Sequence, residues 1–296
     1  MTRAVVFAYH NVGVRCLKVL LAHGVDVRLV VTHEDNPNEE IWFESVAQTA
    51  AQYGIPAITP ENANRPAVLA QIEDCRPDFL FSFYYRSMLD AALLAAAPRG
   101  AYNMHGSLLP KYRGRVPVNW AVLHGERETG ATLHRMVDKP DAGEIVAQQA
   151  VPILPDDTAF EVFGKVTLAA EMALDRALPQ LIAGTAPHVL PDLKAGSYFT
   201  GRKPEDGRID WGKSAEAIHN LVRAVAPPYP GAFTDLPDGR RLRLLRTLRA
   251  FERAPRHAAP TLYREDGVDY VDCADGRVLK VLAWHGDWDG APLPLR

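Results

Sequence analysis

The chain has 296 residues, 23% of them charged, and a formal net charge of -3. Its length fits one medium and one small globular domain, and its slight negative charge gives no general attraction to phosphate backbones, so we expect no nucleic acid partner. Three widely spaced cysteines without a CxxC pair exclude a zinc knuckle and a redox dithiol, and they are typical of reduced thiols in a cytoplasmic protein.

Short apolar runs alternate with amphipathic stretches through the first third of the chain. The first run, residues 4–8, is too short for a signal peptide or a membrane span, so we expect no membrane insertion. The alternation predicts an α/β fold with a doubly wound parallel sheet. A turn at residues 9–11 stands in place of a GxGxxG fingerprint, and no GxxxxGK(S/T) sequence occurs, so we expect no NAD and no phosphate-binding loop. The predicted strands are residues 4–8, 27–32, 55–58, 78–83 and 101–104, and the predicted helices are residues 12–23, 41–53, 67–74 and 87–97.

Ligands of doubly wound sheets bind beyond the carboxyl ends of the strands. Three polar segments follow predicted strands at that edge: residues 9–10, 84–86 and 103–115. We therefore expect these segments to line one crevice.

The middle of the chain predicts a short helix, a hairpin and a long helix. The short helix spans residues 117–124, and the spacing of the apolar runs 131–137 and 144–153 favours a hairpin. Thr158 and Glu161 have the spacing of a capping box, so the long helix should begin there.

The sequence changes in character after residue 190. Loop-like residues 196–207 precede a short helix over 215–225, and Asp275-Gly276 between two β-runs is a hairpin signal. We therefore predict a first domain over residues 1–190, a linker over 191–207 and a small β-rich, barrel-like domain over 208–296.

The loop that follows residues 101–104 carries the residues best suited to chemistry. Asn103 and His105 are two apart on an extended segment, so their side chains should face the same side. An amide that donates hydrogen bonds then lies beside a group that moves protons near neutral pH. This pair suits attack on a carbonyl, with the amide stabilising the oxyanion and the imidazole handling the nucleophile's proton. A carboxylate near His105 would favour and orient the imidazolium, and Asp141 in the Pro-Asp-Ala-Gly segment is a candidate.

Each of these residues also has a purely structural explanation. His105 is one of ten histidines, Asn103 and Asp141 are ordinary turn formers, and the cations at 111–115 are usual for a solvated surface. Ser107 is a rival nucleophile, but His-Gly-Ser-Leu-Leu is not the strained GxSxG elbow that a nucleophilic serine needs. The joint occurrence of these residues at a predicted strand end favours a functional site.

The sequence resembles a known family at several motifs. Residues 103–110, Asn-Met-His-Gly-Ser-Leu-Leu-Pro, followed by Arg113-Gly114 and later by Asp141-Ala142-Gly143, resemble the signature of the 10-formyltetrahydrofolate-dependent formyltransferases. Within that family the chain is most similar to the formyltransferase half of the bifunctional polymyxin-resistance enzymes, which formylates UDP-4-amino-4-deoxy-L-arabinose. The NAD-dependent decarboxylase half is absent from this sequence, so formylation would either stand alone or be paired with a separate decarboxylase partner. The segments that carry this closer similarity are residues 81–86, 111–115, 119–120 and 128–136.

The resemblance implies a role for each motif residue. Asn103 would stabilise the tetrahedral oxyanion, His105 would transfer the proton, and Asp141 would orient and tune His105. The implied co-substrate is 10-formyltetrahydrofolate, with no metal and no NAD, and the implied fold is a Rossmann-like formyltransferase domain followed by the β-rich domain. The implied folate-binding residues are Ser87, Met88, Leu89, Arg115, Val137, Asp138, Lys139, Pro140 and Asp141, and the candidate substrate contacts are Arg86, Lys111 and Arg113.

The formyl acceptor is open between several classes. The resemblance implies UDP-4-amino-4-deoxy-L-arabinose and thus lipid A modification, and a dTDP-linked amino sugar is an alternative because uracil and thymine differ little. Methionyl-tRNA ranks below both, because formyltransferases that act on it carry a basic insertion where this chain has the acidic residues 33–40. A non-catalytic folate- or nucleotide-binding module is an alternative of another class, against which the intact Asn103, His105 and Asp141 argue. The sequence does not indicate the oligomeric state or the roles of His10 and Trp120.

Overall fold

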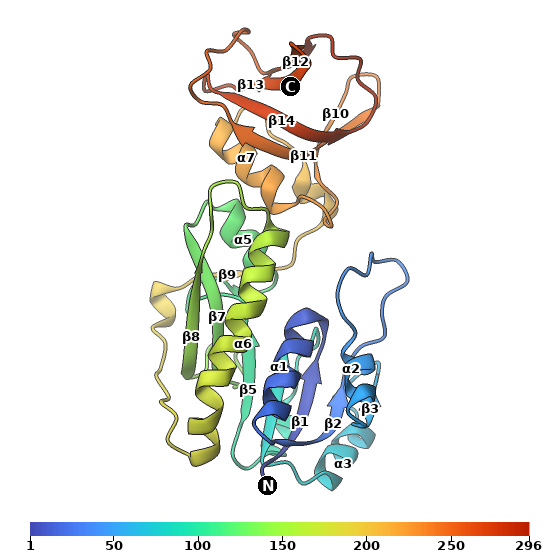
Figure 1. Ribbon diagram of the computed structural model, residues 1–296, viewed down its shortest axis with the longest axis vertical. Helices are drawn as coiled ribbons and strands as arrows, with labels where there is room; N and C mark the ends of the chain where they lie inside the picture. The colour runs from blue at the N-terminus through green and yellow to red at the C-terminus, as the bar shows by residue number, and fades with distance from the viewer. Residues whose placement is uncertain (296) are drawn as a thin grey trace. The chain divides into compact units, whose positions relative to one another are not determined.

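A seven-stranded sheet forms the N-terminal part of the chain in a computed structural model that describes residues 1–295 (Figure 1). The strand order is β3-β2-β1-β4-β5-β7-β8. The first five strands run parallel, which confirms the predicted doubly wound sheet, whereas β7 runs antiparallel to β5. The predicted hairpin therefore extends the sheet beyond β5. The strands are β1 Arg3–Ala8, β2 Asp26–Val31, β3 Ala57–Ile58, β4 Phe79–Phe83, β5 Ala101–His105, β7 Glu128–Arg135 and β8 Ile145–Pro152.

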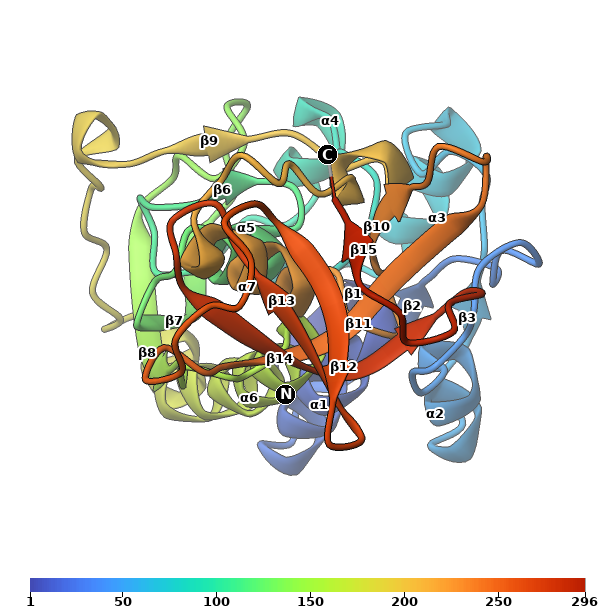
Figure 2. The same cartoon turned by 90° about the horizontal axis from the view of Figure 1, so that it is seen from above.

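Helices cover both faces of this sheet. Figures 1 and 2 show α1 and α6 on one face and α3 and α4 on the other. On the second face, Val68 and Ile72 of α3 and Leu93 of α4 pack in one core with alternate residues of β1 and β2, such as Val5 and Leu29. Burial of both faces explains why the central strands are continuous apolar runs. The helices are α1 His10–Ala22, α2 Val46–Gln52, α3 Pro66–Asp74, α4 Ala91–Ala95, α5 Pro117–Leu123 and α6 Ala159–Ala183.

Three helix starts differ from the sequence prediction. α1 begins directly at His10, so the predicted turn over residues 9–11 is wrong. α2 begins at Val46 rather than at residue 41, and the Trp42 ring packs on His10 instead of lying on a helix face. α4 begins after Asp90, whose side chain accepts a hydrogen bond from the backbone nitrogen of Leu93. At α4 a local cap, and at α2 the ring contact of Trp42, override the apolar periodicity.

The start of α6 follows the predicted capping box. The Glu161 side chain accepts a hydrogen bond from the Thr158 backbone nitrogen at 2.7 Å, and the Thr158 hydroxyl accepts one from the Glu161 nitrogen at 3.2 Å. No helix within residues 1–295 combines the length and the apolar character that a membrane crossing needs.

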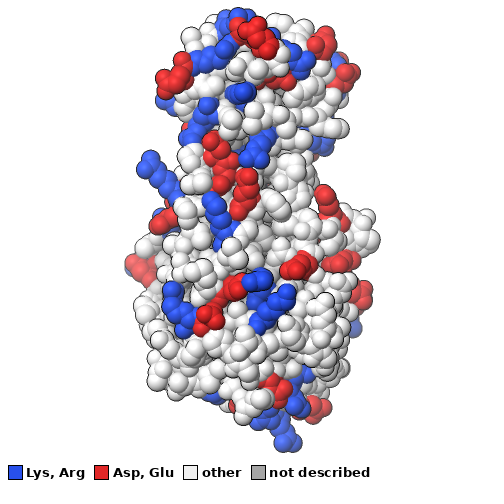
Figure 3. Space-filling view, viewed as in Figure 1, with Lys and Arg blue, Asp and Glu red and all other residues white. Residues whose placement is uncertain are grey.

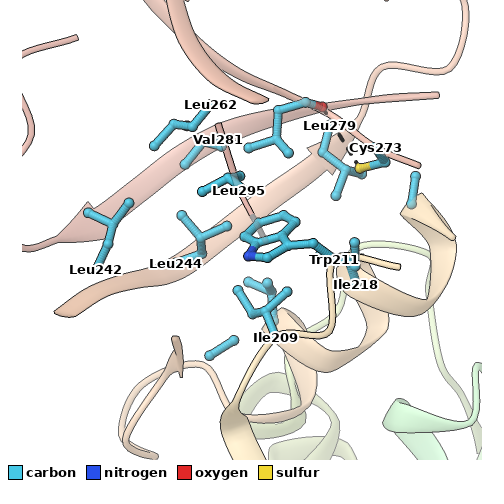
Figure 4. Close-up of a cluster of buried hydrophobic side chains, with 14 of the residues drawn as sticks. Ile209, Trp211, Ile218, Leu242, Leu244, Leu262, Cys273, Leu279, Val281 and Leu295 are labelled. Carbon is cyan, nitrogen blue, oxygen red and sulfur yellow. Dashed lines mark hydrogen bonds between the residues drawn. The ribbon is translucent and has the colours of Figure 1, made fainter. Parts of the chain in front are cut away.

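The C-terminal part is a six-stranded antiparallel sheet in the order β10-β11-β14-β13-β12-β15. The end strands β10 and β15 contribute to one pocket of about 140 Å³, so the sheet curves towards closure and forms a half-barrel. Its core packs Trp211 and Ile218 against Leu244, Leu262 and other strand residues (Figure 4). The strands are β10 Ala232–Asp235, β11 Arg241–Arg249, β12 Thr261–Glu265, β13 Val268–Asp272, β14 Val278–His285 and β15 Leu293–Pro294, and the helix is α7 Ala215–Ala224.

The contacts divide the chain into two compact units. The first comprises Met1–Pro117, Thr129–Val151 and Gly164–Phe199, and it holds the seven-stranded sheet. A two-stranded parallel pair, β6 Arg113–Gly114 and β9 Tyr198–Phe199, also belongs to this unit. The second unit comprises Val118–Glu128, Pro152–Phe163 and residues 200–296.

Candidate active site

The carboxyl end of β5 presents two of the predicted functional side chains. Asn103 and His105 flank the buried Met104, so they point to the same face of the sheet. The register of the antiparallel pair β5–β7 sets Asn103 opposite His134 and His105 opposite Thr132. Asn103 is half-buried, and His105 is buried with 6% of its surface exposed. The two side chains therefore lie side by side in a largely water-excluded position.

Asp141 reaches this pair from the segment between β7 and β8. Its Oδ2 atom accepts a hydrogen bond from the backbone nitrogen of Gly114 at 2.8 Å, and its Oδ1 atom lies 3.5 Å from both His105 Nδ1 and His134 Nε2. Asp141 has a φ of 50°, a sparsely populated conformation for a residue other than glycine. The structure thus groups Asn103, His105 and Asp141 around a second histidine, His134.

Close contacts surround two glycines of the motifs. A Cβ atom on Gly143 would collide with the backbone carbonyl oxygen of Arg135, and a Cβ on Gly106 would meet the side-chain hydroxyl of Tyr84. Only glycine permits the backbone approach at Gly143. Gly143 therefore lets the segment that carries Asp141 pack against the end of β7.

Both ring nitrogens of His105 face oxygen atoms. Nε2 lies 2.8 Å from the carbonyl oxygen of Tyr112, which can only accept, so Nε2 carries the hydrogen. The neutral ring then keeps its lone pair on Nδ1, which faces Asp141 Oδ1. Burial lowers the pKa of His105 below its ordinary value, and the Asp141 carboxylate opposes that shift without cancelling it. His105 is therefore a neutral base at rest, and a proton gained at Nδ1 would lie beside a carboxylate.

Asp141 itself is held in the charged form. Burial raises the pKa of its carboxyl, but His105 and the Gly114 amide lower that pKa by more, to a net value well below the usual range. Asp141 favours the imidazolium of His105, as expected from the sequence, but burial, which the sequence does not show, opposes it by more.

The hydroxyl of Ser107 is engaged within its own loop. Its Oγ atom donates a hydrogen bond to the carbonyl oxygen of Lys111 at 2.6 Å, and the residue is completely buried. The Thr132 hydroxyl donates in turn to the Ser107 carbonyl at 2.6 Å and accepts from the Leu109 nitrogen at 3.1 Å. Ser107 therefore shapes the turn after β5, and its geometry gives no support to a nucleophilic role.

The residues implied as folate contacts lie in three segments of the same unit. Ser87 and Met88 are exposed after β4, whereas Leu89 packs in the core beneath them. Arg115 is exposed, and its backbone nitrogen donates to the Phe199 carbonyl. The remaining implied contacts precede or include Asp141: Val137, Asp138 and Lys139 are exposed, and Pro140 is half-buried.

The three candidate substrate cations differ in their surroundings. Arg86 is exposed, and its Nη1 atom donates to both carboxylate oxygens of Glu39, at 2.9 and 3.0 Å. Arg113 is buried and donates to the Leu193 carbonyl at 3.3 Å. Lys111 is exposed. The three candidate cations therefore differ in burial and in the partners of their side chains.

The expected crevice beside residues 9–10 and 84–86 is occupied by aromatic side chains. The His10 ring stacks on Phe43 with centroids 3.9 Å apart and meets Trp42 edge-on at 4.5 Å. Burial lowers the pKa of His10 to about 3 and raises the pKa of Tyr9 to about 12, so both rings stay uncharged at neutral pH. The segment between β2 and α2 thus packs on the carboxyl end of β1.

His134 is the site residue that the sequence argument did not single out. It is 2% exposed, and its Nε2 atom lies 3.1 Å from Asn103 Nδ2. The signal was present, because Thr132 and His134 are two apart on a predicted strand, as Asn103 and His105 are. The sequence does not give the pairing register of β5 and β7, so it could not show that Thr132 and His134 lie opposite His105 and Asn103.

The distribution of surface charge and the placement of possible metal ligands bear on nucleic acid and metal binding. On the face shown in Figure 3, lysine and arginine side chains are interspersed with aspartate and glutamate. Such a face lacks the continuous positive field of a nucleic acid interface. Within residues 1–295, no group of three or more His, Cys, Asp or Glu side chains is arranged to hold a metal ion.

Comparison with known families matches nearly the whole chain. Residues 11–178 match the family described as formyl transferase, and residues 202–284 match its C-terminal domain. The first match alone covers more than half of the 296 residues.

Solved structures of similar fold include several sugar-modifying enzymes. An N-formyltransferase from Helicobacter canadensis in complex with folinic acid and dTDP-3-aminofucose has a TM-score of 0.74 and 20% identity, over 95% of this chain and 99% of that one. The sugar 3N-formyl transferase WlaRD, with dTDP and 5-N-formyl-THF, has a TM-score of 0.75 and 18% identity, over 95% and 97%. A 4-N formyltransferase from Francisella tularensis has a TM-score of 0.67 and 19% identity, over 81% and 95%. None of these three names UDP-4-amino-4-deoxy-L-arabinose, so the family expected from the motifs is confirmed while the narrower resemblance is not singled out.

Proposed function

Because the chain belongs to the formyl transferase family, we propose that it transfers a formyl group from 10-formyltetrahydrofolate to the amino group of a nucleotide-linked amino sugar. The observation that carries this proposal is the grouping of Asn103 and Asp141 with the buried His105 at the end of β5. An amide donor, a neutral imidazole and an ionised carboxylate are the groups that acyl transfer to an amine requires.

The reaction needs a base, an oxyanion donor and an acid. Nδ1 of His105 accepts a proton from the sugar amine as the amine nitrogen bonds to the formyl carbon. The Asn103 amide donates a hydrogen bond to the oxyanion that forms on the formyl oxygen. The imidazolium then gives its proton to N10 of the folate as the bond from that nitrogen to the formyl carbon breaks. The products are a formamide and tetrahydrofolate, and His105 returns to its neutral form.

Asp141 stabilises the intermediate charge on His105 in this scheme. Its Oδ1 atom faces the nitrogen that gains the proton, at 3.5 Å. Because burial holds His105 neutral at rest, the carboxylate acts mainly when the proton arrives. An isolated buried imidazolium would be far less favourable.

For the folate we propose the segments that the family resemblance implies. These are Ser87 to Leu89, Arg115, and Val137 to Asp141, all in the unit that carries the candidate site. Met88 and Val137 support this role because these apolar residues are 57% and 42% exposed, and an aromatic ligand would cover them favourably. Folinic acid and 5-N-formyl-THF in two structural neighbours also support a folate co-substrate.

The acceptor is proposed to be a dTDP- or UDP-linked amino sugar. The dTDP-linked class has support from two neighbours, which were solved with dTDP-3-aminofucose and with dTDP. UDP-4-amino-4-deoxy-L-arabinose has support from the sequence motifs, and with it a place in lipid A modification. Methionyl-tRNA has less support, because Asp35 and Glu39 put acidic side chains in the segment after β2, where a phosphate backbone would be repelled.

A panel of acceptors tests the proposal. Purified protein is incubated with 10-formyltetrahydrofolate and, in separate reactions, with UDP-4-amino-4-deoxy-L-arabinose, a dTDP-4-amino sugar, a dTDP-3-amino sugar and charged initiator tRNA. We expect tetrahydrofolate and a formylated sugar with at least one nucleotide sugar and none with tRNA. His257→Gln, in the C-terminal unit, should match the wild type. Formylation of the charged tRNA and of no nucleotide sugar would contradict the proposal in favour of a methionyl-tRNA formyltransferase. Folate binding without formylation of any acceptor would favour a binding module.

A further inference from the structure

The hydrogen bonds of His134 determine which of its nitrogens carries the proton. Nδ1 lies 3.0 Å from the carbonyl oxygen of Arg135. A carbonyl oxygen only accepts hydrogen bonds, so Nδ1 must carry a hydrogen. The neutral ring then presents a lone pair at Nε2, 3.1 Å from the side-chain nitrogen of Asn103. Asp141 Oδ1 lies farther from Nε2, at 3.5 Å, which is longer than the usual hydrogen-bond distance.

That lone pair also determines how the Asn103 amide is oriented. Only the NH2 group of the amide can donate to Nε2, so the nitrogen end must point to His134. One N–H is used in this bond, and the other N–H on the same atom remains available as a donor. With the amide reversed, its carbonyl oxygen would face the lone pair of Nε2 and the two acceptors would repel each other.

The position of His134 is set by elements that cannot easily shift. It stands opposite Asn103 in the β5–β7 ladder, where directly opposed side chains on one face are close neighbours. It is 2% exposed, so water does not compete for either nitrogen. Gly143 packs against the same Arg135 carbonyl that accepts from Nδ1.

We propose that His134 is a positioning residue, which holds the Asn103 amide with its nitrogen directed at the oxyanion. The proposal rests on the proposed formyl transfer, in which Asn103 is the oxyanion donor. His134 touches no reacting atom in this scheme and acts through Asn103. Its loss would therefore leave substrate binding intact and weaken only the transition state.

A matched pair of variants separates the two nitrogens. His134→Gln keeps an acceptor near the position of Nε2, whereas His134→Asn keeps a donor near Nδ1 and loses that acceptor. We expect His134→Asn to lower kcat about 10- to 100-fold at nearly unchanged KM, because the amide is misplaced rather than removed. We expect His134→Gln to stay within about threefold of the wild type, since an acceptor still holds the amide. If kcat falls equally in both variants, and the thermal stability falls equally as well, the proposal is overturned and His134 has a packing role.

A double-mutant cycle tests whether His134 acts through Asn103. In an Asn103→Ala background the amide is absent, so adding His134→Asn should cost less than about twofold in kcat. A full additional loss in that background would show that His134 acts independently of Asn103.

A readout without turnover keeps this inference distinct from the proposed reaction. In 15N-labelled protein, the side-chain amide signal of Asn103 is identified by its disappearance in Asn103→Ala. We expect that signal to shift and its hydrogens to exchange faster in His134→Asn, and to stay near the wild-type values in His134→Gln. If no nucleotide sugar is formylated but this pattern holds, the acceptor is wrong and the positioning stands. If formyl transfer occurs and the signal is unchanged in His134→Asn, the positioning is wrong.

Discussion

Asp272 and Asp141 are two aspartates of low exposure that interact with histidine, and their surroundings differ in a way that separates function from structure. Asp272 on β13 is completely buried and accepts four hydrogen bonds: from the backbone nitrogens of Arg256 and His257, from His257 Nδ1 and from the Tyr263 hydroxyl, at 2.8 to 3.2 Å. Asp141 accepts one short hydrogen bond, from Gly114, and keeps its second oxygen 3.5 Å from two histidines.

The number and length of these contacts indicate what each carboxylate does. Asp272 has nearly filled its acceptor capacity with rigid partners, as a carboxylate that organises a loop should. Asp141 leaves an oxygen in reserve beside a ring that can gain a proton, and it does so in a strained backbone conformation. A carboxylate whose oxygens already accept several hydrogen bonds stabilises the fold, whereas one with an oxygen that accepts none is available for chemistry.

We expect the largest loss of kcat when His105, the base beside Asp141, is replaced. His105→Gln removes the only group in the proposed scheme that moves the proton, and general acid–base catalysis contributes roughly 100- to 10,000-fold. We expect kcat to fall within that range while the melting temperature changes little. Formyl transfer is measured as tetrahydrofolate release under saturating nucleotide sugar. Retention of near-full activity would remove His105 from the mechanism.

The same chemical change at the two aspartates should have opposite consequences. Asp272→Asn replaces one acceptor oxygen with an NH2 group that faces buried donors, and it should lower the free energy of unfolding by about 3 kcal/mol. The measurement is urea unfolding, with kcat determined on the folded fraction at low temperature. We expect kcat to be unchanged, because the candidate site lies wholly in the other compact unit. A loss of kcat without a loss of stability would break the comparison.

Asp141→Asn is the counterpart and should mainly affect activity. An amide oxygen can still accept from Gly114, so the fold should lose less than about 1 kcal/mol, whereas the imidazolium of His105 loses its neighbouring charge. We expect kcat to fall roughly 10- to 100-fold.

The pH profile of the Asp141→Asn variant gives a second, signed test. The carboxylate raises the pKa of His105 against the effect of burial, so its removal lowers that pKa. Because His105 must be unprotonated to act as a base, the acidic limb of kcat/KM should move to lower pH. A shift of that limb to higher pH, or none, would contradict the assigned role of Asp141.

The sequence predicted the local parts of this site and missed the parts that depend on pairing. Asn103 and His105 share a face because the strand repeat of two residues is a local property. The approach of Asp141 to His105 was implied by the family resemblance, and no local pattern shows it, because it depends on Gly143 packing on Arg135.

Contacts between residues far apart in the sequence were not predicted either, because they also depend on how the strands and loops pair. His134 faces Asn103 through a register between strands 31 residues apart in sequence, and loop closure of that length has no signature in a hydrophobic pattern. Residues 41–45 read as helix because their apolar spacing fits one, yet Trp42 and Phe43 pack on His10 in another part of the chain. Strands and buried helices were predicted well because burial itself produces the periodicity.

The smallest expected effect concerns the exposed ion pair between Arg86 and Glu39, which extends the comparison from buried to solvated carboxylates. Both side chains are 40% or more exposed, and exposed pairs contribute about 0 to 1 kcal/mol because water and salt screen them. Arg86→Ala should therefore lower the free energy of unfolding by no more than about 1 kcal/mol, including its contact over the Tyr9 ring.

The same variant tests Arg86 as a contact for the nucleotide-sugar phosphates. Arg86 Nη1 already donates to both carboxylate oxygens of Glu39, so a phosphate would compete with a carboxylate that neutralises the guanidinium. We expect KM for the nucleotide sugar to change less than about twofold in Arg86→Ala, since a rim charge that is already paired adds little. Glu39→Ala is the matched control: it frees the guanidinium, and if Arg86 were a phosphate ligand it should lower KM while Arg86→Ala raises it about tenfold. A lower KM in Glu39→Ala together with a higher KM in Arg86→Ala would show that Arg86 binds the substrate. An unchanged KM in both variants would show that Arg86 is only a solvent-exposed partner of Glu39.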